Sequence, residues 1–209
     1  MRYGLIALLL LPLAGCPVKD EAITAPFTDS FERAQLGPEY NNTGAPYEIL
    51  KGKLRIKGAY NHPLWLKKKL PRDAVIELDV VSKTPDGDIK VEAWGDGESH
   101  ATTRGAYLAT SYVFIFGGWG NRESALCRMD EHSEDPQVRQ TRRDVKVVPG
   151  RTYHFTIKRK GKKLEWLIDG KPFLALDDPT PLEGDRHAYF GFNNWQSDLW
   201  FDNLSIKPL

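Results

Sequence analysis

The sequence predicts an all-β fold, a two-sheet antiparallel β-sandwich of the jelly-roll kind. Short segments that alternate apolar and polar residues recur along the chain, and turn signals such as Pro85-Asp86-Gly87 and Asp169-Gly170 separate them. No window of about a dozen residues keeps a helical period with caps. The composition agrees, because 11% of the 209 residues are aromatic and the chain has 18 Gly and 14 Pro, a mixture typical of strands joined by tight turns.

The predicted strands follow one another at short intervals: 53–57, 64–66, 74–81, 89–94, 107–116, 124–130, 152–159, 163–168, 173–176, 187–195 and 199–206. Because successive side chains of a strand point to opposite faces, each strand has a core row and an outer row. The predicted outer row is Glu77 and Asp79 in the third strand, and Lys90, Glu92 and Trp94 in the fourth.

The charges are balanced, with 29 Lys and Arg against 28 Asp and Glu and a net charge of +1. A protein that binds a nucleic-acid duplex usually has an excess of basic residues, so the balance argues against a nucleic-acid partner. Hydrophobic residues at 41% and charged residues at 27% also argue against extensive disorder.

The N-terminus has the pattern of an export signal. The apolar run from Leu5 to Leu13 is shorter than the roughly 20 residues that cross a bilayer, which favours a signal peptide. The run ends in Leu13-Ala14-Gly15-Cys16, which resembles the lipobox of bacterial lipoproteins. The resemblance implies a signal peptide over residues 1–15, a lipid on Cys16 and a tether over 16–26. It also implies an exported protein held on a bacterial cell membrane, the outer membrane being favoured, that faces the periplasm or the surface. An ordinary cleaved signal with a chance cysteine is the alternative.

Cys127 is the only cysteine besides Cys16, so the sequence excludes a disulfide within the mature chain. Alternation places Cys127 on one apolar face with Ala125 and Met129. This predicts a buried thiol rather than a nucleophile.

Three segments carry a resemblance to a known superfamily: Phe27-Thr28-Asp29-Ser30-Phe31, the hairpin pattern from Lys163 to Phe173, and Leu199-Trp200-Phe201-Asp202-Asn203-Leu204-Ser205-Ile206. They resemble the concanavalin A-like lectin and glucanase superfamily, which includes laminin-G-like domains, legume lectins and many polysaccharide hydrolases and lyases. The resemblance implies one jelly-roll domain over residues 27–209. Glucanases of the superfamily carry a Glu-x-Asp-x-x-Glu strand, of which this chain has Glu77 and Asp79 but Ser82 in the third place. Their mechanism is therefore in doubt here.

A polar and aromatic row in the strand at 187–195 predicts a sugar-binding surface. Phe190 and Phe192 are assigned to the core, and Tyr189, Asn193 and Trp195 to the outer row with the adjoining Asn194. Pyranose rings stack on Trp or Tyr while amides bind their hydroxyl groups. The predicted carbohydrate site, on the concave face of the sandwich, also takes Trp119 and Asn121 from the Gly-rich loop that begins at Gly117.

Charged residues follow this loop. Arg128, Asp130 and His132 are expected to share a face, with Glu131 opposite unless the strand has already ended. Arginine binds carboxylates, so Arg122, Arg128 and Arg142 are expected to favour acidic or decorated glycans. Glu131 or His132 are candidates for the acid or base of a glycoside hydrolase or lyase. The alternative is a strip of surface salt bridges, which stabilises little.

Metal ligands are sparse. Asp202, with a carbonyl near Phe27 to Asp29, resembles a structural calcium position of the superfamily, and no other cofactor is expected. The histidines lack zinc spacing. Three functions stay open: a lipid-anchored carbohydrate-binding protein of the envelope, a polysaccharide hydrolase or lyase, and a structural interaction module.

Overall fold

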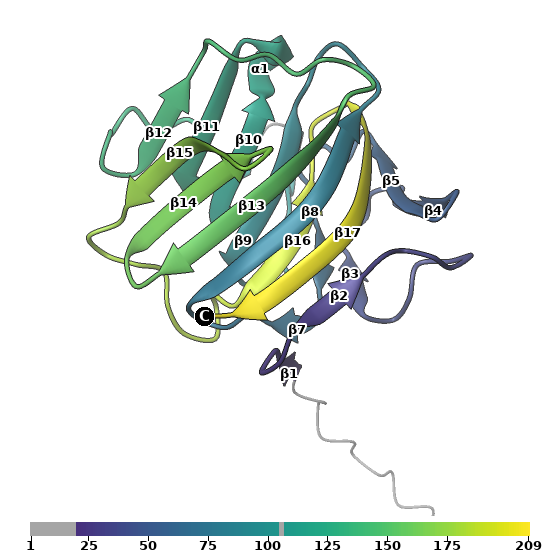
Figure 1. Ribbon diagram of the computed structural model, residues 1–209, viewed down its shortest axis with the longest axis horizontal. Helices are drawn as coiled ribbons and strands as arrows, with labels where there is room; N and C mark the ends of the chain where they lie inside the picture. The colour runs from purple at the N-terminus through teal and green to yellow at the C-terminus, as the bar shows by residue number, and fades with distance from the viewer. Residues whose placement is uncertain (1–19, 105–106) are drawn as a thin grey trace, which may run out of the picture.

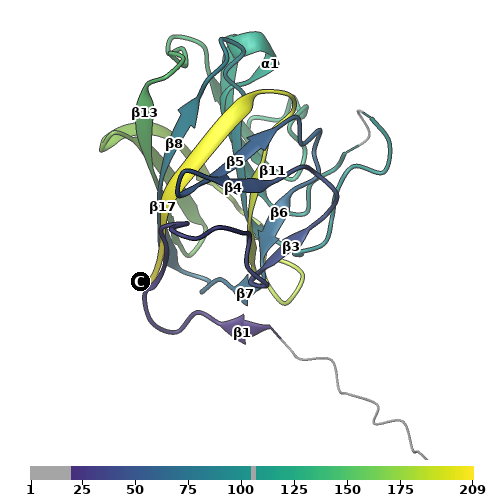
Figure 2. The same ribbon diagram turned by 90° about the vertical axis from the view of Figure 1, so that its right-hand side faces the viewer.

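Two antiparallel sheets pack face to face in the computed structural model, which describes residues 20–104 and 107–209 (Figures 1 and 2). The seven-stranded sheet has the spatial order β12 (Arg139–Arg142), β11 (Glu123–Arg128), β10 (Tyr112–Gly117), β9 (Ile89–Gly95), β16 (Tyr189–Asn193), β6 (Leu64–Leu66) and β3 (Tyr40–Asn42). The predicted β-sandwich is therefore confirmed.

The eight-stranded sheet has the order β15 (Lys171–Asp177), β14 (Lys163–Ile168), β13 (Thr152–Lys160), β8 (Ala74–Ser82), β17 (Asp198–Pro208), β5 (Lys53–Lys57) and β4 (Glu48–Leu50), and β2 (Phe27–Asp29) also pairs with β17. A parallel pair, β1 (Glu21–Ala22) and β7 (Lys68–Lys69), lies apart from both sheets, and the short turn α1 (Gly118–Asn121) joins β10 to β11. Each strand predicted from alternation is present. The strands 53–57, 64–66 and 163–168 have the predicted bounds and the others have shifted ends, whereas the short strands β1 to β4, β7 and β12 were not predicted from alternation.

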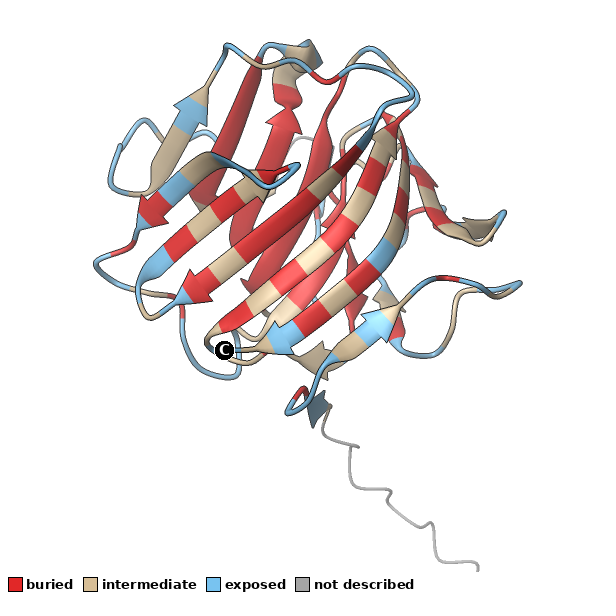
Figure 3. Ribbon diagram, viewed as in Figure 1, coloured by how far each residue is buried: buried red, intermediate tan, exposed pale blue. Residues whose placement is uncertain are grey.

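The inner rows of the two sheets form one hydrophobic core. Within it, the ring of Trp166 meets those of Phe114, Phe155 and Phe173 at centroid distances of 5.7, 5.1 and 4.8 Å. Figure 3 shows the alternation of buried and partly exposed residues along β8, whereas β9 and β10 are buried along their whole length. The outer face of β9 and β10 is therefore covered by other parts of the chain.

The prediction that Trp94 lies in the outer row was wrong. Trp94 has a left-handed backbone with φ of 57°, and it is the extra residue of a β-bulge, because Tyr189 pairs with Gly95 and Phe190 with Ala93. The bulge turns the indole into the core, where it meets Tyr112 edge to face at 6.2 Å.

Cys127 is fully buried, as predicted, in a second small cluster with Ala125 and Val113. Burial raises the pKa of its thiol to about 12, which argues against a nucleophilic role. The expected neighbour Met129 is not there. The strand ends at Arg128, and Met129 has a φ of 65° that turns its side chain to the main core.

Part of the expected tether is folded onto the domain. Glu21 and Ala22 pair with Lys68 and Lys69, and Ile23 is buried in the main core. The signal peptide and Cys16 lie outside the described residues. Over residues 20–104 and 107–209, no helix combines the length and apolar character needed to span a membrane.

Candidate functional site

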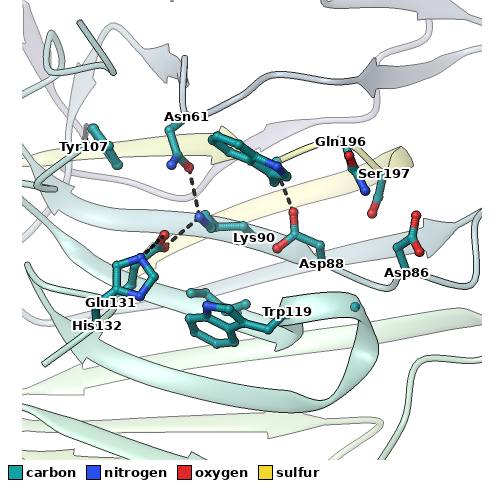
Figure 4. A pocket seen from close by; sticks show the side chains of 14 residues that line it. Asn61, Asp86, Asp88, Lys90, Tyr107, Trp119, Glu131, His132, Gln196 and Ser197 are labelled. Atoms are coloured by element: carbon teal, nitrogen blue, oxygen red, sulfur yellow. Dashed lines mark hydrogen bonds and ion pairs between the residues drawn. The ribbon is translucent and has the colours of Figure 1, made fainter. Parts of the chain in front are cut away.

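A cavity of about 280 Å³ opens on the outer face of the seven-stranded sheet (Figure 4). We call it the tryptophan pocket, and its lining residues are Asn61, Asp86, Asp88, Lys90, Tyr107, Ile115, Gly118, Trp119, Gly120, Glu131, His132, Trp195, Gln196 and Ser197. They come from β9 and β10, from α1 and from the neighbouring loops. The loops and α1 together cover the outer face of β9 and β10.

The floor of the pocket holds a buried ion pair. Lys90 alternates onto this face of β9, and its Nζ donates to Oε2 of Glu131 at 2.6 Å and to Oδ1 of Asn61 at 2.9 Å (Figure 4). Burial by itself lowers the pKa of Lys90, but the charges of Glu131 and Asp88 outweigh it, so the pKa lies above its ordinary value. The side chain of Lys90 is therefore a charged ammonium group, and nearby carboxylates rather than water stabilise its positive charge.

Asp88 lies beside this pair. Burial raises the pKa of its carboxyl group to about 6, although Lys90 and the hydrogen bond from the backbone of Trp195 favour the ionised form. The carboxyl oxygen Oδ2 accepts that hydrogen bond from the Trp195 N–H. The floor thus contains a carboxyl group that gains or loses its proton in mildly acidic solution.

Trp119 and Trp195 line the pocket from different segments. Trp119 meets His132 edge to face at 5.9 Å, and the guanidinium of Arg139 lies 5.3 Å from its ring centroid. Trp195 meets Tyr60 edge to face at 5.1 Å, and Arg104 lies over both rings. Both indoles are thus supported by neighbours and are held in place beside the cavity.

The backbone around the pocket is strained. Tyr60, Asn61, Asp88 and Trp119 all have φ between 50° and 62°, in the left-handed region that costs a non-glycine residue about 1 kcal/mol or more. Such residues persist where the surroundings fix them, and they concentrate at binding and catalytic sites. Their gathering here supports a functional role for this face.

A buried carboxylate organises the layer next to the pocket. Glu92 accepts hydrogen bonds from Ser111 Oγ at 2.5 Å, Tyr107 Oη at 2.8 and 2.9 Å, and Asn193 Nδ2 at 2.7 Å. Burial raises the pKa of Glu92 above its ordinary value, while these donors favour the ionised form. Tyr107 lines the pocket, so Glu92 fixes one of its side chains.

Four of the predicted site residues line the tryptophan pocket: Trp119, Glu131, His132 and Trp195. Asn193 and Asn194 lie beside it but are fully buried, contrary to their expected role on an open surface. Asn193 bonds Glu92, and the side-chain oxygen of Asn194 accepts from the Ala59 N–H at 2.8 Å. Their amides hold the protein loops together instead of facing a ligand.

Three further predicted residues lie outside the pocket. Asn121 exchanges hydrogen bonds with the backbone of Val147 and donates to Pro85, so its amide ties loops together. Arg122 donates to the carbonyl of Trp119 at 2.6 Å and lines a neighbouring, more open cavity of about 610 Å³. Tyr189 lines a separate cavity.

The expected face of Arg128, Asp130 and His132 does not form. Because β11 ends at Arg128 and Met129 is left-handed, the chain turns and Glu131 reaches Lys90. Arg128 pairs instead with Asp178 at 3.1 Å, and Asp130 accepts from the backbone of His132.

Arg142 also lies away from the pocket. It pairs with Asp144 at 2.6 Å, and its guanidinium lies 4.6 Å from the ring centroid of Phe173. Of the three arginines expected to bind acidic glycans, only Arg122 lies near the pocket.

Sequence reasoning missed most of the polar lining. Lys90 was placed correctly on an outer row, Asp86 was noted only as part of a turn, and Asp88 was not singled out. The signal for Asp88 and Lys90 was their alternation with Ile89, which sets both charged side chains on one face of the strand. Asn61 had no comparable signal.

The carboxylates that match the glucanase strand lie on the other sheet. Glu77 and Asp79 face outward from β8, where Lys207 donates to Glu77 at 2.9 Å and His154 lies 2.8 Å from Asp79. They are remote in the fold from the lining of the tryptophan pocket.

The donor set near Asp202 does not fit a calcium ion. Its carboxylate accepts from the ammonium of Lys53 and from the backbone of Asn203. Across residues 20–104 and 107–209, no group of three or more His, Cys, Asp or Glu side chains could hold a metal ion.

A scan against protein-family models finds no match, and a search of curated proteins finds none either. Solved structures do match. The carbohydrate-binding module CBM66 from Bacillus subtilis has a TM-score of 0.58 at 12% identity, with 81% of this chain and 95% of that chain covered. The apo Crh5 transglycosylase has a TM-score of 0.66 at 10% identity, covering 92% and 88%. A prokaryotic β-1,3-1,4-glucanase from a mouse hindgut metagenome has a TM-score of 0.61 at 10% identity, covering 88% and 100%.

The fold is that of the concanavalin A-like sandwich, as the sequence resemblance implied. At identities this low the similarity concerns the fold alone, because one fold hosts many functions.

Proposed function

We propose that the protein binds a carbohydrate in the tryptophan pocket. The observation that carries this proposal is the combination of Trp119 and Trp195 with a polar floor of Asn61, Lys90 and Glu131. Apolar sugar faces stack on indoles, and carboxylates, amides and ammonium groups bind hydroxyls. The structural neighbours, which include a carbohydrate-binding module and a glucanase, support the same class of ligand.

Ser197 gives independent support for a polar ligand. Its hydroxyl oxygen is buried, has no hydrogen-bond partner among the described residues, and belongs to a residue that lines the pocket. Buried polar groups are rarely left unpaired, so such a group at a cavity suits a ligand that supplies the missing bond.

The test is a broad glycan array followed by calorimetry on any glycan retained. Trp195→Ala and Trp119→Ala are each expected to weaken binding about tenfold or more, the usual effect of removing an aromatic anchor. Ser197→Ala should weaken it less, because it removes one hydrogen bond. Trp200→Ala is the matched control, because Trp200 lies on β17 of the other sheet and bonds Asp198. Absence of binding, or unchanged affinity of Trp195→Ala, contradicts the proposal.

A polysaccharide hydrolase or lyase is the second candidate. The observation that favours it is the place of Glu131, whose carboxylate meets Lys90 on one oxygen and lies 3.6 Å from Nε2 of His132 with the other. Such a pair can exchange a proton with a bound substrate. Incubation with retained oligosaccharides, followed by product mass and absorbance of unsaturated uronate, distinguishes an enzyme from a binder. If the oligosaccharide is recovered intact, and His132→Ala changes neither affinity nor product, the function is binding.

If neither binding nor turnover is found and a protein partner co-purifies, the structural module is favoured.

We also propose that Cys16 carries a lipid that anchors the protein to a bacterial membrane. From Cys16 to Glu21 the chain spans at most roughly 18 Å, and β1 lies at the opposite end of the sandwich from α1 (Figure 1). An anchor at Cys16 would therefore direct the pocket away from the membrane. Cys16→Ser should give an uncleaved or soluble form, and mass spectrometry of the parent should find acyl chains on Cys16. Unchanged membrane fractionation together with no acyl mass on Cys16 contradicts the proposal.

A further inference from the structure

Asp88 connects the segments that carry the two tryptophans. Its backbone N–H donates to the carbonyl of Gly117 at 2.8 Å, at the start of the turn that carries Trp119. Its carboxylate accepts from the backbone N–H of Trp195. One residue therefore touches the backbone of both segments, which are far apart in the sequence.

The other hydrogen bonds to the backbone of Asn194 and Trp195 involve groups that do not titrate. The Tyr60 N–H donates to the Trp195 carbonyl at 2.9 Å, and the Asn61 N–H donates to the carbonyl of Asn194 at 3.1 Å. Among the described residues, Asp88 is the only titratable side chain that hydrogen-bonds to the backbone of Asn194 and Trp195. A bond to a carboxylate is roughly twice as strong as a bond to a neutral acceptor, so its protonation weakens this contact selectively.

Charged groups face Asp88 from three segments. Lys90 of β9 attracts its negative charge, whereas Glu131 from the β11–β12 loop and Asp86 from its own loop repel it. His132 lines the same cavity. The two nearby carboxylates and the burial of Asp88 all favour the protonated form, and Lys90 opposes it.

We propose that Asp88 is the positioning residue of the tryptophan pocket: its carboxylate holds Trp195 in place relative to Trp119, and its protonation loosens Trp195 and weakens ligand binding in acid. Since the pKa of Asp88 is about 6, the change falls in mildly acidic solution. If only the ionised form holds a ligand, the affinity falls about tenfold between pH 7 and pH 5. The consequence for binding rests on the proposed function, but the movement of Trp195 does not.

The test is ¹⁹F NMR of the full chain labelled with 5-fluorotryptophan, in which the six tryptophans are assigned by single Trp→Phe variants. The Trp195 resonance is expected to shift with a midpoint near pH 6, and the Trp200 resonance to stay constant between pH 5 and 8. In Asp88→Asn the Trp195 shift should disappear. His132→Gln is the matched control, because His132 lines the same pocket and contacts Trp119 rather than Trp195. It should leave the pH-dependent shift of the Trp195 resonance unchanged.

A measurement on the unmodified sequence guards against misfolding of Asp88→Asn. With ¹³C-labelled aspartate, the Asp88 carboxyl resonance should titrate with the same midpoint as Trp195. A Trp195 resonance that is independent of pH, that titrates unchanged in Asp88→Asn, or that has a midpoint different from that of the carboxyl overturns the proposal. A negative glycan array together with a matching titration would reject the proposed function and retain the positioning role.

Discussion

The outer faces of the two sheets carry similar residues in different surroundings. On β8, Glu77 and Asp79 are partly exposed and pair with Lys207 and His154 across the sheet. On β9, the equivalent outward row contains Lys90 and Glu92, which are buried under the loops that form the tryptophan pocket. Charges at a surface are screened by water, whereas buried charges depend on their partners. Of these two outward rows, the one on β9 carries the buried charges, and its Lys90 lines the tryptophan pocket.

The largest expected effect comes from removing the buried cation. Lys90→Met leaves Glu131 and Asp88 without their compensating charge, and we expect a loss of about 3–5 kcal/mol in the free energy of unfolding. Urea unfolding at neutral pH measures it. Lys207→Met on the other sheet is the control, with an expected loss of about 1 kcal/mol or less because that pair is exposed. Equal losses of unfolding free energy in the two variants would contradict the distinction between the buried and the exposed face.

The carboxyl group of Asp88 should make the folded protein more stable in acid than above pH 6. Its pKa of about 6 in the folded protein lies above its ordinary value, so its ionisation opposes folding as the pH rises through 6. Asp88→Asn is therefore expected to raise the free energy of unfolding at pH 8 by up to about 3 kcal/mol, and to have little effect near pH 3.5. Denaturant titrations of both proteins across this range test the sign. A variant that is destabilised at pH 8 would contradict it.

Glu77 should show the opposite dependence on a smaller scale. The hydrogen bond from Lys207 lowers the pKa of Glu77, so its contribution is present above the unfolded pKa and is lost as the pH falls through the folded value. Because the pair is partly exposed, Glu77→Gln should cost only about 0.5 kcal/mol at pH 7 and nothing at pH 3. Thermal unfolding at the two pH values measures it, and an equal loss at both values would contradict the predicted dependence on pH.

Removal of divalent cations should have the smallest effect. The carboxylate of Asp202 forms an ion pair with Lys53 rather than binding a metal ion, so we expect a chelator to leave Tm unchanged. Calorimetry with and without the chelator tests this, and a fall in Tm would restore the calcium site that the superfamily resemblance implied.

The alternation of residues was enough to predict the sandwich and most of its strands. The Gly-rich loop, the charged cluster after it and the polar row of the strand at 187–195 placed Trp119, Glu131, His132 and Trp195 among the candidates. Alternation failed at Trp94 and Met129, where one left-handed residue reverses the pattern that follows. Those reversals depend on packing against strands and loops from elsewhere in the chain, which a local pattern does not contain.

Local alternation was sufficient to predict the fold class, the buried thiol of Cys127 and the outward direction of Lys90 and Glu92. That this outward face is covered, and that it holds a pocket, depends on how distant segments pack together. The reason is the distance along the chain between the partners: Lys90 meets Glu131 41 residues away, and Asp88 meets Trp195 107 residues away. Alternation specifies to which side of a strand a side chain points, and the packing of distant loops specifies whether it meets water, a charge or a ligand.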